Sequence, residues 1–384
     1  MEAYLDNSAT TKCSARAAEL MMRLLTEDYG NPSSLHVMGA KAEEYIKEAK
    51  KKIAKTLKAS EKEIIFTSGG TESNNLAILG SAEANKRAGN HIITTAIEHA
   101  SVAQPMQRLE ELGYRVTYLP VDSSGTVRLD ALKEALDDET ILVSIMHVNN
   151  EIGTIEPIAE ASAIIHEKAP RALFHVDAIQ SYGKIPVYPK KLGIDLLSAS
   201  GHKIHGPKGI GFLYIKEKTK IKPVVYGGGQ QKGMRSGTEN VPAIAALAEA
   251  AAECYENLTV NAESMYGLRE YFIREAQKIP GVTINGKTGT EAAPHIVSVS
   301  VQDVRSEVLL HSLEEKGVYI SAGSACSSNK PAVSQTLIAI GLKKELLDAT
   351  VRFSFCRATT KEEVEYALSQ LAEIIPFRRK FTRK

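Results

Sequence analysis

The chain of 384 residues has no tryptophan, only four cysteines and a net charge of only +1. The cysteines, at Cys13, Cys254, Cys326 and Cys356, lie far apart and lack the short spacings of zinc sites. This pattern argues against a disulfide scaffold and a structural metal centre, so we expect no metal. A net charge this close to zero also argues against direct binding of nucleic acid.

Long apolar runs are also missing, and the first residues lack the basic and apolar regions of a secretory signal. No stretch reaches the roughly 20 apolar residues that a membrane-spanning helix needs. The C-terminal FRRKFTRK is basic but short, and a solvated chain end explains it best. We therefore expect a cytoplasmic protein that binds no membrane.

The pattern that is present is an alternation of strand-like and helix-like segments, in a chain that is 43% hydrophobic and 24% charged. The strand-like runs are 63–67, 91–95, 115–121, 141–146, 172–177, 194–199 and 211–215. This alternation predicts an α/β fold with a mostly parallel seven-stranded sheet that is covered by helices on both faces. The turn between the last two runs is too short for a crossover helix, so we expect the last strand to be antiparallel.

Long helical sequence from Val241 to Lys278 separates this sheet from the rest of the chain. The remainder mixes strand-like and helix-like segments; its strand-like runs are 295–301, 318–322 and 350–355. We predict a large domain over residues 15–255, and a smaller α+β domain formed by residues 1–14 and 256–384.

The stretch IDLLSASGHKIHGPKGIGFLYI, Ile194–Ile215, places a lysine in a polar turn between two apolar runs. His202 and His205 lie next to this lysine, Lys203. Burial and neighbouring cations would favour its neutral amine, which is the form that attacks carbonyl groups. Taken alone, a basic surface turn is the simpler interpretation, because most lysines are solvated.

Polar residues also follow several of the predicted strands. TSGGTESNN begins a helix after the first strand, where free N–H groups together with Ser68 and Thr71 form a possible phosphate site. It is neither a Walker loop nor a dinucleotide motif. His99, Asn150 and Asp177 follow three other strands, and the carboxyl ends of parallel strands meet at one edge of a sheet. Each of these residues could also be an ordinary polar residue of a loop.

Together, a phosphate site, a carboxylate, an imidazole, an amide and a lysine are what a pyridoxal phosphate site needs. At this point the chain resembles the cysteine desulfurases of the NifS/IscS type, which belong to the class V aminotransferases of fold type I. The matching motifs, which extend over nearly the whole chain, are YLDNSATT, YGNPSS, TSGGTESNN, EH, NNEIG, HVDAIQ, SGHKIHGPKG, RSGTEN, SACSS and VRFS. The resemblance implies a fold of the pyridoxal phosphate-dependent transferases, with pyridoxal 5'-phosphate as the cofactor.

The resemblance also implies a role for each residue around the cofactor ring. Lys203 would bind the cofactor covalently, Asp177 would pair with its pyridine nitrogen, and Gln180 would bond its ring oxygen. His99 would stack on the ring and move protons, and Asn150 would contact both the ring oxygen and the substrate.

Further roles implied by the resemblance concern the phosphate, the substrate and the sulfur. The residues that would hold the phosphate are Gly70, Thr71, Ser200 and His202. Thr238 of RSGTEN would reach the cofactor phosphate of a neighbouring subunit, which implies a homodimer. Arg352 would bind the substrate carboxylate, and Cys326, in the small-residue run GSACSS, would accept the sulfur.

The implied activity is that of a sulfurtransferase that converts L-cysteine to L-alanine and leaves a persulfide on Cys326. The sulfur would then pass to an acceptor protein, either an iron–sulfur scaffold or a tRNA-thiolating enzyme. The alternatives are a selenocysteine lyase, another fold type I enzyme such as an aminotransferase, and an inactive partner-binding scaffold. Cys326 argues against an aminotransferase, and Lys203, Asp177 and His99 argue against an inactive scaffold.

Overall fold

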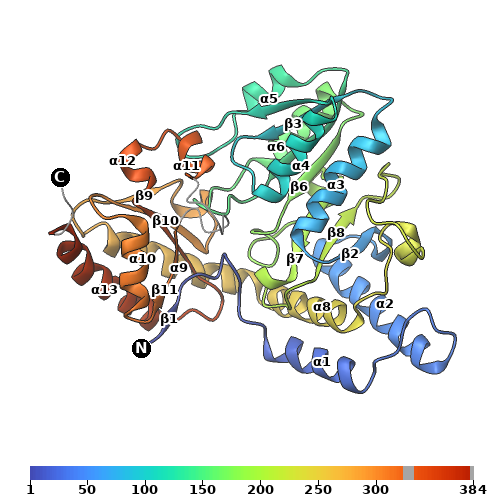
Figure 1. The fold of residues 1–384 in the computed structure, drawn as a ribbon, viewed down its shortest axis with the longest axis horizontal. Helices are drawn as coiled ribbons and strands as arrows, with labels where there is room; N and C mark the ends of the chain where they lie inside the picture. The colour runs from blue at the N-terminus through green and yellow to red at the C-terminus, as the bar shows by residue number, and fades with distance from the viewer. Residues whose placement is uncertain (323–332, 381–384) are drawn as a thin grey trace.

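The computed structural model describes residues 1–322 and 333–380, which form two parts that lie side by side (Figure 1). Each part has its own hydrophobic core. Cys326 falls between the two ranges and lies outside the described residues. No helix within these ranges is both long and apolar enough to cross a membrane.

A seven-stranded sheet forms the centre of the large part, in the order β2-β8-β7-β6-β5-β3-β4. Its strands are β2 (Ile64–Thr67), β3 (His91–Thr95), β4 (Arg115–Leu119), β5 (Thr140–Met146), β6 (Leu173–Asp177), β7 (Leu196–Ser200) and β8 (Gly211–Ile215). β8 runs antiparallel to both of its neighbours, and the other neighbouring pairs are parallel. The predicted mixed sheet, with the last strand antiparallel, is therefore confirmed.

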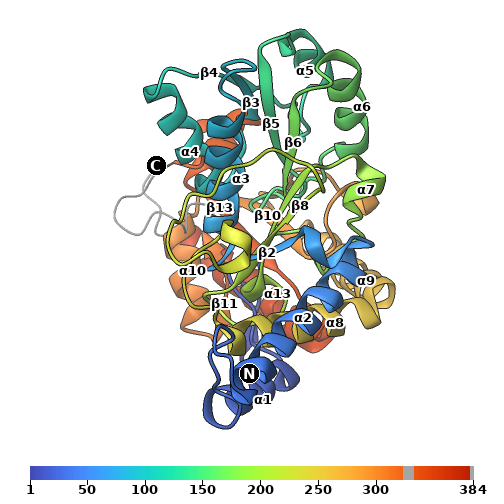
Figure 2. The same cartoon turned by 90° about the vertical axis from the view of Figure 1, so that its right-hand side faces the viewer.

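Helices cover both faces of this sheet, because alternate residues of each strand point to opposite sides. Phe66 of β2 belongs to the core beneath α2 and α8, whereas its neighbour Ile65 packs with Leu76 and Ala77 of α3. Figure 2 shows α3 and α4 on one side of the sheet and α6 on the other. The helices of the large part are α1 (Ala15–Thr26), α2 (Val37–Leu57), α3 (Gly70–Asn85), α4 (Ala100–Glu111), α5 (Leu129–Ala135), α6 (Ile158–Lys168), α7 (Pro189–Leu192) and α8 (Val241–Glu256).

The small part combines antiparallel strands with flanking helices, and α9 (Leu258–Ala276) leads into it. Its four-stranded sheet has the order β12-β13-β10-β9. The strands are β9 (Val282–Asn285), β10 (Ile296–Val301), β12 (Ser321–Ala322) and β13 (Thr350–Ser354), and the helices are α10 (Ser306–Glu314), α11 (Gln335–Ala339), α12 (Lys344–Leu347) and α13 (Lys361–Arg379). This is the α+β arrangement expected for the second half of the chain.

The expected single strand at 318–322 is wrong. The run is divided at Ile320, because β11 (Val318–Tyr319) pairs in parallel with β1 (Ala3–Tyr4) near the N-terminus, whereas β12 pairs with β13. The chain therefore begins in the small part, where Ala3 and Leu5 are fully buried in the core. The boundary assigned to the two domains in the sequence stays a prediction.

The segment after β1 connects the two parts. The side-chain amide of Asn7 donates to the Ser354 carbonyl over 3.0 Å, which fixes the segment to β13. Four residues later, the backbone N–H of Thr11 donates to the His202 carbonyl over 2.8 Å, in the turn after β7. The N-terminal segment thus brings the small part to the end of the large sheet from which the predicted site residues extend.

Candidate active site

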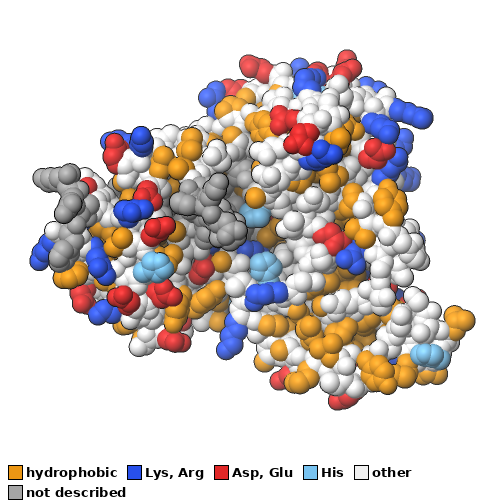
Figure 3. Space-filling model, in the orientation of Figure 1, with side chains coloured by type: hydrophobic (Ala, Val, Ile, Leu, Met, Phe, Trp, Pro, Cys, Tyr) orange, Lys and Arg blue, Asp and Glu red, His pale blue; other side chains and the backbone are white. Residues whose placement is uncertain are grey.

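The predicted site residues gather at the carboxyl ends of the central strands. Asp177 is the last residue of β6 and Ser200 is the last residue of β7, and Lys203 ends the short 3-10 helix η2 (Gly201–Lys203) that follows. In the register of the sheet, Asp177 lies beside Met146 of β5 and Ser198 of β7. Figure 3 shows histidine and basic side chains exposed at the junction of the two parts.

Lys203 is partly buried under the N-terminal segment. Its Nζ donates to the carbonyl oxygens of Ser8, over 2.5 Å, and of Ala9, over 2.7 Å. Its own carbonyl accepts a bond of 2.9 Å from the buried Lys184 Nζ. The alternative of a freely solvated surface turn is therefore wrong for this lysine, although Lys208 in the same turn is exposed.

A buried hydrogen-bond network connects Asp177 with His99. Asn74 Nδ2 donates to Asp177 Oδ2 over 2.8 Å and lies equally close to Ser101 Oγ. Ser101 Oγ in turn lies 2.8 Å from His99 Nδ1. The backbone N–H of Ile179 donates to the other oxygen, Asp177 Oδ1, over 2.9 Å. The network fixes the orientation of both the carboxylate and the imidazole ring.

The electrostatic surroundings of Asp177 favour a positively charged partner. Burial raises the pKa of its carboxyl, and the hydrogen bonds together with His99 and Lys203 oppose this rise. A buried carboxylate is costly unless a cation or several donors compensate its charge. A protonated ring nitrogen beside Asp177 would provide this compensation.

Gln180 lies between the N-terminal segment and the small part. Its Nε2 donates to the Ser8 carbonyl over 3.0 Å, and its Oε1 lies 3.3 Å from Nε2 of the buried His295. Ser8 therefore accepts bonds from both Lys203 and Gln180, so these two predicted residues are close together.

A cavity of about 390 Å³ opens at the start of α3. The predicted phosphate residues all line it, and the full lining is Ala9, Thr10, Ser68, Gly69, Gly70, Thr71, Glu72, Ser200, His202, Lys208 and Gly209. Among the described residues, no side chain caps the first N–H groups of α3, so they are available to an anion. A Cβ at Gly70 would lie 2.2 Å from Ile179 Cδ1, so any larger residue would push on the loop after Asp177. We call this cavity the phosphate cup.

His202 contributes a neutral imidazole to the phosphate cup. Burial, together with the charges of Lys203 and Lys208, lowers its pKa to about 4. Its Nδ1 lies 3.2 Å from the Thr10 hydroxyl, which orients the ring. A neutral imidazole can donate one hydrogen bond to a phosphate oxygen at physiological pH.

These groups fit pyridoxal phosphate. The phosphate cup offers N–H and hydroxyl donors, Asp177 offers a buried carboxylate for the ring nitrogen, and Lys203 offers a primary amine for the aldehyde. This set of groups can therefore hold the phosphate, the ring nitrogen and the aldehyde of the cofactor without an additional ligand.

Arg352 lies in β13 of the small part and faces the same junction. Its Nη1 donates to the backbone carbonyl of Asn150 over 2.7 Å, and its Nη2 lies 3.1 Å from Asp6 Oδ1 and 3.2 Å from Ser321 Oγ. Its Nε is buried and has no hydrogen-bond partner within the described part of the chain. Arg352 and Asn150, both predicted to contact the substrate, are therefore in contact with each other.

Two predicted residues are not among this group. Thr238 is exposed on the loop between β8 and α8 and does not line the phosphate cup. Cys326 lies outside the described residues. The individual roles inferred from the resemblance stay predictions for all of the site residues.

Sequence reasoning missed several residues that position the site. Asn74 and Ser101 form the link between Asp177 and His99, and Asp6 contacts Arg352. Glu98 is half-buried: its Oε1 accepts bonds from the Thr95 hydroxyl and the Met146 N–H, and desolvation raises the pKa of its carboxyl well above the usual value. Three of them stand in the recognised motifs YLDNSATT, TSGGTESNN and EH, which was the available signal.

Comparison with known proteins identifies what the chain is similar to. The family model described as "Aminotransferase class-V" matches residues 3–367. A curated relative, "Cysteine desulfurase IscS" of Dictyoglomus turgidum, is 47% identical over 97% of this chain and 94% of the relative. A solved structure described as "NIFS-LIKE PROTEIN" has a TM-score of 0.93 and 40% identity, covering 98% of this chain and 100% of the other. Another, "SspA in complex with cysteine", has a TM-score of 0.81 and 34% identity, covering 93% and 100% of the two chains.

Proposed function

This chain belongs to the aminotransferase class-V family, and we propose that it acts as a homodimer that passes sulfur from L-cysteine to an acceptor protein. It is a pyridoxal phosphate-dependent cysteine desulfurase of the NifS/IscS type. The observation that carries the proposed assignment of its site is the meeting of Lys203, Asp177 and the phosphate cup at one edge of the sheet.

The residues of the chain divide the chemistry among them. When bound, pyridoxal phosphate would supply a protonated ring that can accept electron density from the substrate. Asp177, oriented by Asn74, would keep the proton on the ring nitrogen, and Lys203 would hold the cofactor through its amine. Arg352 binds the substrate carboxylate, and His99 moves protons at its ring nitrogens.

Sulfur transfer requires a nucleophile, and we assign this role to Cys326. Its thiolate attacks the sulfur of the substrate, the bond between sulfur and the β-carbon breaks, and the β-carbon takes up a proton. One L-cysteine and one thiol thus give one L-alanine and one persulfide, without an external oxidant or reductant.

The experiment that tests this assignment compares the wild type with Cys326→Ser. The wild type should release alanine from cysteine and form a persulfide on Cys326, both measurable by chromatography and mass spectrometry. Cys326→Ser should bind pyridoxal phosphate with unchanged absorbance but form no persulfide and little alanine. The matched control is Cys13→Ser, which replaces a half-buried cysteine for which we propose no chemistry. Near-normal alanine formation by Cys326→Ser would contradict the assignment.

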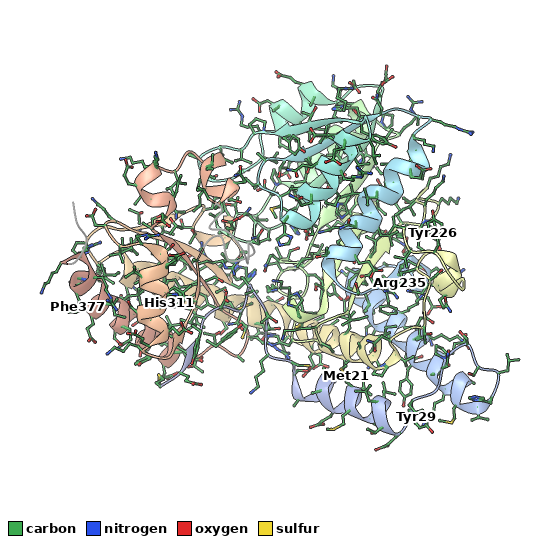
Figure 4. All side chains as sticks on the ribbon, viewed as in Figure 1. Met21, Tyr29, Tyr226, Arg235, His311 and Phe377 are labelled. Atoms are coloured by element: carbon green, nitrogen blue, oxygen red, sulfur yellow. The ribbon has the colours of Figure 1, made fainter. Side chains whose placement is uncertain are left out.

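The homodimer is supported by the exposed position of Thr238 and by an apolar surface. This surface lies where α1 ends and α2 begins, and its exposed members are Met22, Leu25, Tyr29, Leu35 and Val37. Figure 4 shows Tyr29 at the connection between α1 and α2. Large exposed apolar patches mark interfaces. We propose that a second copy covers this surface and that Thr238 reaches the phosphate cup of that copy.

The acceptor of the sulfur is the remaining part of the proposal. An iron–sulfur scaffold and a tRNA-thiolating enzyme both take sulfur from a protein persulfide, and we propose that one of them is served in the cytoplasm. Capture of partners by the persulfide form, with Cys326→Ser as the control, would identify it. If the persulfide form captured neither an iron–sulfur scaffold nor a tRNA-thiolating enzyme, the proposed acceptor would be wrong.

A further inference from the structure

Among the described residues that line the phosphate cup, one is acidic, and this is unexpected for a site that binds a phosphate. Glu72 lines the cup from the first turn of α3, next to Gly70 and Thr71. A carboxylate and a phosphate dianion repel each other, and burial strengthens the repulsion because the effective dielectric constant falls. The charge of Glu72 therefore has to be compensated if the cup is to hold a phosphate.

Arg235 supplies this compensation through a bidentate ion pair. Its Nε lies 2.8 Å from Glu72 Oε1, and its Nη2 lies 3.2 Å from Glu72 Oε2. The same Oε2 accepts a bond of 2.9 Å from the Ser68 N–H. Both side chains are largely buried, with 14% of Glu72 and 25% of Arg235 exposed, so the pair is partly shielded from water and salt. Burial would raise the pKa of Glu72, but the bonds from Arg235 and Ser68 lower it.

The loop that provides Arg235 is itself fastened to the sheet. The side-chain amide of Gln231 accepts from the Phe66 N–H over 2.7 Å and donates to the Phe66 carbonyl over 2.8 Å. Gln231 thereby occupies the open edge of β2 as a neighbouring strand would, and it adopts a positive φ of 50° to do so. Together, Gln231 and Arg235 fix the start of the RSGT run against β2 and α3. Figure 4 shows Arg235 in the large part, on the side away from the small part.

We propose that Arg235 is a positioning residue for the cofactor phosphate: it neutralises Glu72 in the wall of the phosphate cup and holds the loop 227–240 against α3. The proposal rests on the proposed function, because it assumes that the cup receives the phosphate of pyridoxal phosphate. It adds a residue that touches neither the cofactor nor the substrate but sets the charge of the site. If the ion pair were purely structural, its loss would not weaken binding of pyridoxal phosphate more than binding of pyridoxal.

The experiment measures equilibrium binding of pyridoxal phosphate, and of pyridoxal without the phosphate, to protein that has been stripped of its cofactor. Arg235→Gln should weaken binding of pyridoxal phosphate about tenfold, the size expected of one uncompensated charge in a partly solvated wall. Binding of pyridoxal should stay within twofold of the wild type. The double variant with Arg235→Gln and Glu72→Gln should bind pyridoxal phosphate with an affinity within twofold of that of the single variant Glu72→Gln.

The matched control is Arg305→Gln, which breaks an ion pair with Asp348 in the small part and should leave both affinities unchanged. Thermal unfolding separates loss of fold from loss of affinity, and Arg235→Lys, which keeps the charge, should lose less affinity than Arg235→Gln. Wild-type affinity in Arg235→Gln, or no recovery in the double variant, would overturn the charge compensation. Equal affinity of the wild type for pyridoxal and pyridoxal phosphate would instead overturn the assignment of the cup, and the proposal with it.

Discussion

Arg352 and Asp6 lie 3.1 Å apart, from guanidinium Nη2 to carboxylate Oδ1, although 346 residues separate them in the chain. Arg352 is the residue expected to bind the substrate carboxylate, and Asp6 belongs to the segment that also contacts Lys203 through Ser8 and Ala9. One short N-terminal segment therefore touches both the residue that would bind the substrate and the residue that would carry the cofactor. Its position depends on pairing of the first strand with the small part.

Arg352→Ala is expected to raise the KM for cysteine, because it removes a charge-assisted hydrogen bond worth about 1.5 to 3 kcal/mol, or roughly ten- to a hundredfold. The absorbance of the bound cofactor should not change, because Arg352 contacts Asn150, Asp6 and Ser321 and not the phosphate cup. Arg352→Lys should recover only part of the loss, since it keeps the charge without the bidentate geometry. An unchanged KM in Arg352→Ala would mean that the substrate carboxylate is bound elsewhere.

Lys203→Ala is expected to abolish the covalent attachment of the cofactor. Borohydride reduction followed by peptide mass spectrometry should find the pyridoxyl group on Lys203 in the wild type and on no lysine in the variant. Lys208→Ala, in the same turn but exposed, is the matched control and should keep the label on Lys203. A label on another lysine of the wild type would contradict the assignment.

Thr238→Ala is expected to weaken retention of the cofactor while the homodimer persists. Thr238 is exposed on its own subunit, and its hydroxyl would supply one hydrogen bond to the phosphate in the cup of the second copy. Dialysis followed by absorbance measures the retained cofactor, and analytical ultracentrifugation measures the assembly. The control is Thr290→Ala, another exposed threonine, which should retain the cofactor normally. A monomer with full cofactor content and full activity would disprove the shared site.

Glu156 is expected to make the stability of the fold depend on pH. Its side chain is buried, one carboxyl oxygen accepts from the Val127 N–H over 2.8 Å, and burial raises the pKa to about 8 from an ordinary value of 4.5. Between these two values the folded protein keeps a proton that the unfolded chain releases. The stabilising contribution is therefore fully present below pH 4.5 and is lost as the pH rises through about 8.

Glu156→Gln stays neutral at every pH and keeps the acceptor for Val127. The free energy of unfolding of both proteins is measured with urea from pH 5.5 to 8.5. The value for the variant minus that for the wild type should increase by up to about 1.4 kcal/mol for each pH unit. The difference between the two proteins isolates this carboxyl from the other titrating groups. Parallel stability curves for the wild type and the variant would show that Glu156 does not retain its proton.

The long alternating strands could be predicted to within a few residues, because burial on both faces leaves a continuous apolar run in the sequence. Shorter elements leave no such pattern: the sequence predicts neither β9 nor α5, and it predicts a single strand over 318–322. The motif TSGGTESNN predicts the start of a helix without fixing its first residue; α3 begins at Gly70, where the first turn has no side-chain cap within the described residues. Local periodicity therefore reports the middle of an element better than its ends.

The sequence by itself determined the predicted chemistry of the site. Residues such as Lys203 and Asp177 stand in motifs that follow one another along the chain in the same order as in the family that the sequence resembles. Only the tertiary structure decided how these residues are supported: Asp6 against Arg352, Asn74 between Asp177 and Ser101, and Arg235 on Glu72. The physical reason is that each of these contacts joins segments far apart in the chain. Such contacts depend on how the two cores pack and how the first strand pairs, and no local pattern of residues encodes that arrangement.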